Sequence, residues 1–269
     1  MKKYSFTFTA NWVFDSPVRH HHFLLRCMPG TYSFQRTYAH RLTLTPFAAV
    51  ADVTDSYGNS MFSGSISKAH GSFGYTATGF VLCSSYLIRE PLDRLFLFPT
   101  ELTAPSGAME EALRTADLPE KGTWARIEAL CRLVFENVTY EVGATGVGTD
   151  AAEAFRLAKG VSRDFVHVFV SLCRADGVPA RYVTGLARGV ARSHVWAEVY
   201  WNGAWYAMDP TFGRRAEEGY LKIAHGLDYS DCPVDRFCYD DMETIHAAKT
   251  VSVRVSDYVA AARDTIPHA

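Results

Sequence analysis

The fold is decided by residues 160–185, which read GVSRDFVHVFVSLCRADGVPARYVTG. Gly160 and Val161 interrupt a helical pattern, and apolar residues then recur at helical spacing until Gly177. Ser162 is therefore expected to begin a helix that leads into a strand over residues 180–187. A nucleophile at a helix start gains from the positive end of the helix dipole and from free backbone amides that stabilise an oxyanion.

Two further strands are expected downstream, over residues 194–201 and 204–209. They flank Asn202-Gly203, the strongest short hairpin signal in the chain. The far ends of an antiparallel hairpin lie side by side, and here they hold His194 and Asp209. The arrangement predicts His194 as a base that reaches Ser162, with Asp209 orienting its ring.

Each of these three residues also has a purely structural interpretation. Ser162 can be a helix cap, His194 a satisfied histidine at a strand end, and Asp209 a turn former before a proline. Each structural interpretation is favoured when its residue is taken alone. The three residues in this order and context favour a nucleophile, a base and an orienting carboxylate.

The rest of the chain divides into two predicted domains. Residues 1–105 are rich in Thr, Tyr, Phe and Val, alternate over short runs and predict a β-rich, sandwich-like module. Residues 106–269 predict an α+β domain. Strands are expected at 4–9, 40–45, 74–83 and 95–98, a turn at 55–59, and helices at about 107–116, 123–137 and 151–159.

The central motifs resemble those of the bacterial transglutaminase-like superfamily, which has the papain-like cysteine protease fold. GVSRDF (160–165), HVWAEV (194–199) and WYAMDPT (205–211) are similar to its nucleophile, histidine and aspartate motifs, and the family pattern has Gly-Val-Cys-Arg-Asp at its head. Residues 223–231 resemble its downstream segment. A weaker resemblance covers residues 55–59 and the β-rich first hundred residues, which look like the module that often precedes this catalytic domain.

The resemblance implies an α+β, papain/transglutaminase-like catalytic domain after a β-rich N-terminal module. It implies a catalytic triad of Ser162, His194 and Asp209, with Tyr140 a candidate for lining the acyl site. We also expect Trp196 to border a groove that binds an extended peptide, because such a groove needs apolar walls. Core packing is an equal alternative for Tyr140.

Position 162 departs from the family pattern, because the family has cysteine there and this chain has serine. A thiol beside a histidine and a helix start ionises readily, whereas a hydroxyl needs concerted base catalysis. Three explanations fit: a deliberately disabled nucleophile, a natural inactive relative, or a true serine enzyme. We expect the serine form to be inactive or strongly weakened. Cys173 lies about three turns, ~16 Å, along the same helix and is expected to be structural.

The function that the resemblance implies is amide-directed acyl transfer through an acyl-enzyme on peptide or isopeptide bonds, with hydrolysis favoured over cross-linking. The chain itself would supply nucleophile, base and oxyanion donors, so no cofactor is implied. One alternative is a catalytically inactive peptide-binding or scaffolding relative. A weaker alternative is a small-molecule acyltransferase, which would have to bind an acetyl cofactor.

Composition limits the partners further. A net charge of −2 and a pI near 6.5 give no basic field for nucleic acid or an anionic membrane. No signal peptide or membrane span is expected, so cytoplasmic localisation is the expectation. The six scattered cysteines are expected to be mostly buried apolar residues, and the neighbours His20, His21 and His22 should face opposite ways rather than form a metal site. The substrate's identity and the oligomeric state stay open.

Overall fold

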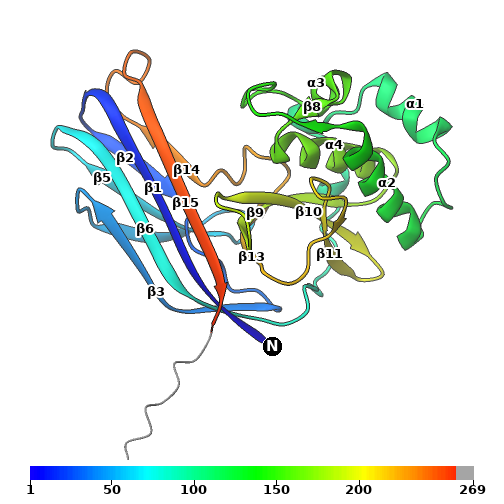
Figure 1. The fold of residues 1–269 in the computed structure, drawn as a ribbon, viewed down its shortest axis with the longest axis horizontal. Helices are drawn as coiled ribbons and strands as arrows, with labels where there is room; N and C mark the ends of the chain where they lie inside the picture. Colours follow the sequence, from blue (N-terminus) through cyan, green and yellow to red (C-terminus); the bar gives the residue numbers. More distant parts are fainter. Residues whose placement is uncertain (259–269) are drawn as a thin grey trace, which may run out of the picture.

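The computed structural model describes residues 1–258, which form two facing β-sheets beside a group of helices that packs on a third sheet (Figure 1). The first sheet has the strand order β15-β1-β6-β3 and the second has the order β14-β2-β5-β4. Their bounds are β1 Lys2–Val18, β2 His21–Leu25, β3 Gln35–Thr45, β4 Val50–Thr54, β5 Ser60–Ile66, β6 His70–Cys83, β14 Asp235–Cys238 and β15 Ala247–Asp257.

The alternation of residues in β1 explains why these two sheets face each other. Tyr4, Phe6 and Phe8 are buried, while Thr7 and Asn11 between and beyond them are exposed. Side chains of a strand point alternately to its two faces, so one face of β1 is apolar and packs inward. Aromatic side chains pack in the core between the two sheets. The ring centroids of Trp12 and Phe237, for example, are 4.7 Å apart.

The last strands of the chain return to the N-terminal sheets. β15 pairs antiparallel with β1, and β14 pairs with β2. The β-rich part therefore uses residues from both ends of the described chain. The domain boundary near residue 105 stays a prediction, and this pairing means that two strands after it belong to the N-terminal sheets.

The middle of the chain forms the α+β part, and this confirms the predicted fold class. Its sheet has the strand order β12-β11-β10-β9-β13, and a short parallel pair, β7 and β8, lies apart from it. The bounds are α1 Gly107–Thr115, α2 Trp124–Asn137, β7 Thr139–Tyr140, α3 Ala151–Leu157, β8 Lys159–Gly160, α4 Ser162–Ala175, β9 Ala180–Ala187, β10 His194–Trp201, β11 Ala204–Asp209, β12 Arg214–Arg215 and β13 Tyr220–Gly226. Helix α4 packs against β9 and β10 and is buried from Asp164 to Arg174.

One predicted strand is wrong. Residues 95–98 were expected to extend, but Arg94–Leu97 form a short 3₁₀ helix, η1, and Glu101–Thr103 form a second, η2. The Asp93 carboxylate accepts a hydrogen bond from the Leu95 backbone N–H at 2.9 Å. This local cap competes with strand pairing, as aspartate commonly does.

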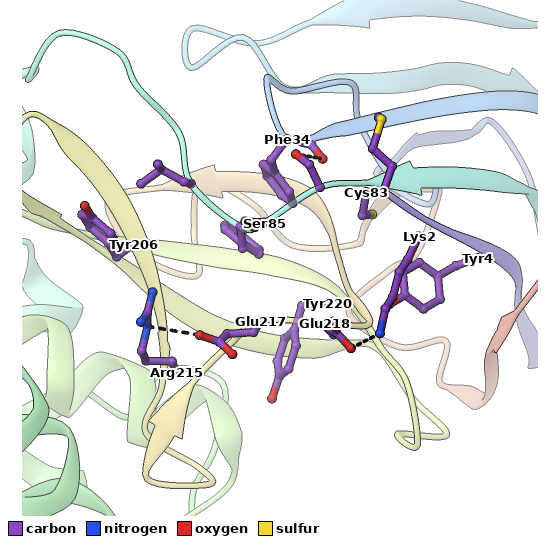
Figure 2. Close-up of a pocket in the computed structure, with 14 residues that line it drawn as sticks. Lys2, Tyr4, Phe34, Cys83, Ser85, Tyr206, Arg215, Glu217, Glu218 and Tyr220 are labelled. Carbon is purple, nitrogen blue, oxygen red and sulfur yellow. Dashed lines mark hydrogen bonds and ion pairs between the residues drawn. The ribbon is translucent and has the colours of Figure 1, made fainter.

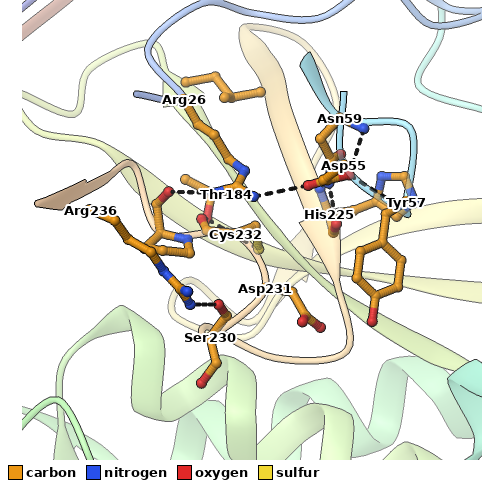
Figure 3. A network of polar contacts seen from close by, with 12 residues as sticks. Arg26, Asp55, Tyr57, Asn59, Thr184, His225, Ser230, Asp231, Cys232 and Arg236 are labelled. Carbon is orange, nitrogen blue, oxygen red and sulfur yellow. Dashed lines mark hydrogen bonds and ion pairs between the residues drawn. The ribbon is translucent and has the colours of Figure 1, made fainter. Parts of the chain in front are cut away.

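The predicted turn at residues 55–59 attaches the β-rich part to the edge strand β13. Asn59 exchanges two hydrogen bonds with the His225 backbone, at 2.7 and 2.9 Å, and Asp55 accepts from Arg26 at 3.0 Å (Figure 3). Gly58 has φ +79° in this turn, a conformation that glycine adopts without a steric penalty. The turn thereby secures β13 next to β9, the strand that pairs with β10.

Candidate active site

The chain before α4 is held by the carboxylate of Asp164. This buried side chain accepts a hydrogen bond from the Val161 backbone N–H at 2.8 Å and another from the Thr145 hydroxyl at 2.6 Å. A Cβ on Gly160 would lie 2.6 Å from one Asp164 oxygen, so only glycine fits there without displacement. Gly160 and Asp164 together fix the direction in which the chain enters the helix.

Ser162 is the first residue of α4 and is half-buried. The predicted helix start is therefore confirmed. The backbone N–H groups of the first helical turn lack partners within the helix, and the helix dipole adds positive potential there. Within residues 1–258, no hydrogen bond joins the Ser162 hydroxyl to the His194 ring; such bonds are often long until substrate binds.

His194 and Asp209 form the buried pair that the hairpin predicts. Nε2 of His194 lies 2.6 Å from Oδ2 of Asp209, and the two side chains are 3% and 0% exposed. β10 and β11 are antiparallel neighbours in register from Ala197 opposite Met208 to Trp201 opposite Ala204, so their far ends meet. The bond through Nε2 leaves Nδ1 as the ring nitrogen available to another group.

Asp209 is held by two further donors that the sequence did not indicate. The Tyr220 hydroxyl donates to Oδ2 at 2.8 Å, and the Thr211 backbone N–H donates to Oδ1 at 3.0 Å. Burial raises the pKa of Tyr220, and the nearby Asp209 charge raises it further, so the hydroxyl remains a donor. A carboxylate with three donors is fixed in place and keeps the His194 ring in one orientation.

Phe212 is a second residue that sequence reasoning missed. Its ring centroid lies 5.5 Å from that of His194, while 44% of the residue remains exposed. It therefore shields one side of the imidazole and presents an apolar surface to solvent. Its position soon after Asp209, on the segment that leaves β11, is the one signal that could have marked it.

The two predicted substrate-contacting aromatics differ in position. Tyr140 is 55% exposed in β7 and lies directly opposite Gly160 in the parallel pair with β8, close to the start of α4. The expectation for Trp196 has to be corrected, because Trp196 is fully buried and its indole N–H donates to the Tyr86 hydroxyl at 3.0 Å. Trp196 packs over Gly185, where any Cβ would clash with the indole. It supports the sheet under His194 and does not border a groove.

A buried charged cluster lies further along β10. Glu198 is fully buried and contacts Arg181, the Lys222 ammonium at 2.7 Å and the Tyr86 hydroxyl at 2.7 Å. Burial raises the pKa of Glu198, but the Arg181 and Lys222 charges outweigh burial and lower it to about 2. Burial lowers the pKa of Lys222 to about 7. The cluster joins β10, β9 and β13, and the Tyr86 hydroxyl connects it to the Trp196 indole.

Within residues 1–258, no hydrogen bond joins the His194–Asp209 pair to a cysteine or to His20, His21 or His22, but burial and then the nearby Asp209 charge raise the pKa of the Cys131 thiol. Five cysteines, Cys173 among them, are buried and free, and Cys238 is exposed. His21 is buried against the His70 ring, with 3.1 Å between Nδ1 and Nε2, while His20 and His22 are exposed. Among residues 1–258 no group of three or more His, Cys, Asp or Glu side chains is arranged to hold a metal ion.

Two hollows border the segment that carries Tyr220. Figure 2 shows the first, which lies between the β-rich part, at Lys2, Tyr4 and Phe34, and the α+β part, at Arg215 and Tyr220. The second hollow lies between α2 and β12 and also touches Tyr220. No helix of the described residues is both long and apolar enough to cross a membrane.

Comparisons with known proteins agree with this architecture. Residues 4–82 match the model of the bacterial transglutaminase-like N-terminal region, and residues 111–210 match that of the transglutaminase-like superfamily. The chain has the fold of a solved structure described as a candidate cysteine protease from Cytophaga hutchinsonii, with a TM-score of 0.79, 22% identity, and coverage of 96% of this chain and 92% of that one.

Relatives among mycobacterial proteins are uncharacterized. One from Mycobacterium tuberculosis is 25% identical over 241 residues, which cover 74% of this chain and 75% of the relative. One from Mycobacterium leprae is 32% identical over 115 residues, which cover 39% of this chain and 41% of the relative. Residues 111–210 are therefore similar to the transglutaminase-like superfamily, residues 4–82 are similar to the bacterial transglutaminase-like N-terminal region, and the chain shares its fold with the Cytophaga hutchinsonii structure.

Proposed function

We propose that this protein is built for amide-directed acyl transfer, with position 162 as the nucleophile, His194 as the base and Asp209 as the group that orients the base. The substrate is a peptide or protein, and hydrolysis of a peptide or isopeptide bond is the reaction. The observation that supports this most is the buried His194–Asp209 pair, held at 2.6 Å and braced by the Tyr220 hydroxyl.

The chemistry follows from these positions. The nucleophile at the start of α4 attacks the carbonyl carbon while His194 takes its proton, and the free amides of the helix start stabilise the oxyanion. The protonated imidazole then gives its proton to the departing amine, which leaves an acyl-enzyme. Water, activated by the same imidazole, attacks the acyl-enzyme, releases the acid and restores position 162.

Serine at position 162 weakens this reaction. A thiol is ionised beside an imidazolium and a helix start, whereas a hydroxyl transfers its proton only as the new bond forms. A site shaped for the larger sulfur also places the hydroxyl oxygen farther from both carbonyl and base, and a misplacement of about 1 Å can cost ~100-fold in rate. We therefore propose that the serine form turns over slowly or not at all.

A second candidate function is peptide binding without turnover. It is favoured by one observation, the serine at position 162, which retains the site's shape without its most reactive atom. The exposed Tyr140 and Phe212 would then contact a bound peptide. The buried His194–Asp209 pair argues for catalysis, because pure binding does not need a buried imidazole oriented by a carboxylate.

Turnover by Ser162→Cys tests the proposal. The variant, the serine protein and the double variant Ser162→Cys/His194→Ala are incubated with a peptide library that includes Gln–Lys isopeptides, and new amines are detected by mass spectrometry. We expect cleavage by the cysteine variant, a loss of at least about 100-fold in the double variant, and little activity in the serine protein. Binding of library peptides by all three proteins without cleavage would favour the binding function instead.

A further inference from the structure

The second hollow, between α2 and β12, lies directly beside the Asp209 end of the proposed catalytic pair. Met208 and Gly213 line it from either side of Asp209 in sequence, and Tyr220, whose hydroxyl donates to Asp209, forms part of its wall. Arg214 is the residue opposite Asp209 in the β11–β12 pairing. Cβ atoms of directly opposed residues are about 4.5–5.5 Å apart, so the Arg214 side chain starts next to Asp209.

Phe212 lies close to both Arg214 and His194. The Arg214 guanidinium lies 5.2 Å from the centre of the Phe212 ring, and that ring lies 5.5 Å from the His194 ring. Arg214 is also close enough to Tyr220 to oppose, in part, the rise in the Tyr220 pKa that burial causes. A ligand group held by Arg214 would therefore sit beside the residues that orient the base.

The hollow is rich in arginine, and two of its arginines lack an acidic partner. Four arginines line it, Arg132, Arg188, Arg214 and Arg215, together with three glutamates. Arg188 pairs with Asp257 at 2.8 Å and Arg215 with Glu217 at 3.5 Å. Within residues 1–258, neither Arg132 nor Arg214 lies within 4.0 Å of a carboxylate oxygen.

The remaining glutamates do not neutralise these two arginines. Glu218 pairs with Lys2, as Figure 2 shows, and one oxygen of Glu128 accepts from the Trp124 indole at 2.7 Å. Arg132 comes from helix α2 and Arg214 from strand β12, so the two guanidinium groups border the hollow from different elements. Guanidinium forks bind carboxylates with two parallel hydrogen bonds, which a neutral amide cannot match.

We propose that the hollow is a subsite for a substrate carboxylate, so that the substrate is an acidic peptide whose negative charge is held by Arg132 and Arg214 beside Asp209 and Tyr220. This inference rests on the proposed function of the Ser162–His194–Asp209 site. The carboxylate comes either from the C-terminus of the peptide or from a Glu or Asp side chain. Both sources present the same anion, and the two are separable by experiment.

Affinity labels test the subsite without knowledge of the natural substrate. Ser162→Cys is treated with iodoacetylated amino acids of one to four methylenes that end either in a carboxylate or in a carboxamide. We expect the carboxylate member to react about tenfold faster than its carboxamide at one spacer length. Arg132→Gln and Arg214→Gln should each bring the ratio of the carboxylate rate to the carboxamide rate close to one. Arg89→Gln, which removes an exposed arginine outside the hollow, should leave the ratio unchanged.

Peptide pairs then separate the two sources of the carboxylate. In the first arm the two peptides of a pair differ only in ending with a carboxylate or a carboxamide. In the second arm the two peptides differ in having Glu or Gln at one position, and each position of the peptide is tested in turn. The measurement is kcat/KM of the Ser162→Cys protein for each peptide. Preference in the first arm assigns the C-terminus, and preference in the second assigns a side chain. Either preference, expressed as the ratio of kcat/KM for the charged and the neutral peptide of a pair, should fall about tenfold in Arg214→Gln.

The outcomes that overturn this inference differ from those that overturn the proposed function. If the introduced thiol reacts well but the carboxylate ratio stays near one at every spacer length, or survives Arg132→Gln and Arg214→Gln, the carboxylate subsite is wrong and the acyl-transfer site stands. If the thiol at position 162 shows no reactivity above that of an ordinary cysteine with either reagent, the proposed function is wrong and the subsite falls with it. Thermal unfolding of each variant confirms that it is folded.

Discussion

The Tyr220 hydroxyl donates a hydrogen bond of 2.8 Å to Asp209, the same carboxylate that contacts His194 at 2.6 Å. Removing this donor by Tyr220→Phe should loosen the carboxylate without emptying the space. A hydrogen bond to a charged group contributes about 1.5–3 kcal/mol, so we expect kcat/KM of the Ser162→Cys protein to fall about tenfold or more. Steady-state kinetics with one cleaved peptide measures this, and an unchanged kcat/KM would show that Tyr220 has no part in holding Asp209.

Gly160→Ala should disturb the entry to α4. The added Cβ would lie 2.6 Å from an Asp164 oxygen and would push the carboxylate off the Val161 N–H and the Thr145 hydroxyl. We expect a loss of about 1–3 kcal/mol in the free energy of unfolding, and a lower reactivity of a thiol at position 162. Gly107→Ala is the matched control, because a Cβ there meets nothing within 4 Å. Equal urea midpoints for the two variants would contradict this account of Gly160.

Acid should weaken the buried cluster around Glu198. The folded-state pKa of Glu198, about 2, is below its ordinary value of 4.5, so its stabilising contribution is complete above about pH 4.5 and is lost as the pH falls toward 2. Glu198→Gln leaves Lys222 and Arg181 without their buried partner and should cost about 3–5 kcal/mol near neutral pH. The difference in the free energy of unfolding between the unsubstituted protein and Glu198→Gln should therefore decrease as the pH falls from 4.5 to 3.

Urea unfolding at pH 7, 4 and 3 measures this difference in the free energy of unfolding. Glu153→Gln serves as the control, because Glu153 forms an exposed pair with Arg156 on α3 and should give a small difference at every pH. If Glu198→Gln lowers the free energy of unfolding by the same amount from pH 7 to pH 3, the Glu198 carboxylate does not contribute to the pH dependence of stability as proposed.

The β-rich part should not fold well from residues 1–105 alone. Without β14 and β15, the strands β1 and β2 would each have an unpaired edge, and exposed edges of long strands promote aggregation. We expect a fragment of residues 1–105 to aggregate and the chain of residues 1–258 to stay soluble. Size-exclusion chromatography compares the two, and a monomeric, cooperatively unfolding fragment would contradict this expectation.

The sequence predicted the candidate site where local rules sufficed. Asn202-Gly203 determined the hairpin, and the hairpin register brought His194 beside Asp209. The contact of Tyr220 with Asp209 could not be predicted in this way. Tyr220 lies on a different strand, β13, and the sequence does not specify the path of the connection that leads to it. Trp196 was misplaced since aromatic character alone does not tell a groove wall from a core residue.

The fold was predicted in kind but not in its long-range pairing. Alternation in β1 indicated a β-rich module, yet nothing local showed that β15 would pair with it across most of the chain length. Residues 95–98 have the composition of a strand, and the Asp93 cap makes them a 3₁₀ helix. Pairing and capping of this kind depend on which segments meet in space.

The reactivity of a thiol at position 162 tests the central claim most directly. Ser162→Cys, with and without His194→Ala, is treated with iodoacetamide from pH 5 to pH 9, and adducts are located by mass spectrometry. Cys238, the exposed native cysteine, is an internal reference, and the five buried cysteines should be inert. We expect the introduced thiol to reach its full rate below pH 7, because the His194 imidazolium and the α4 amides stabilise the thiolate, and to behave like Cys238 once His194 is removed. Equal rates at position 162 with and without His194 would contradict the proposed pairing of nucleophile and base.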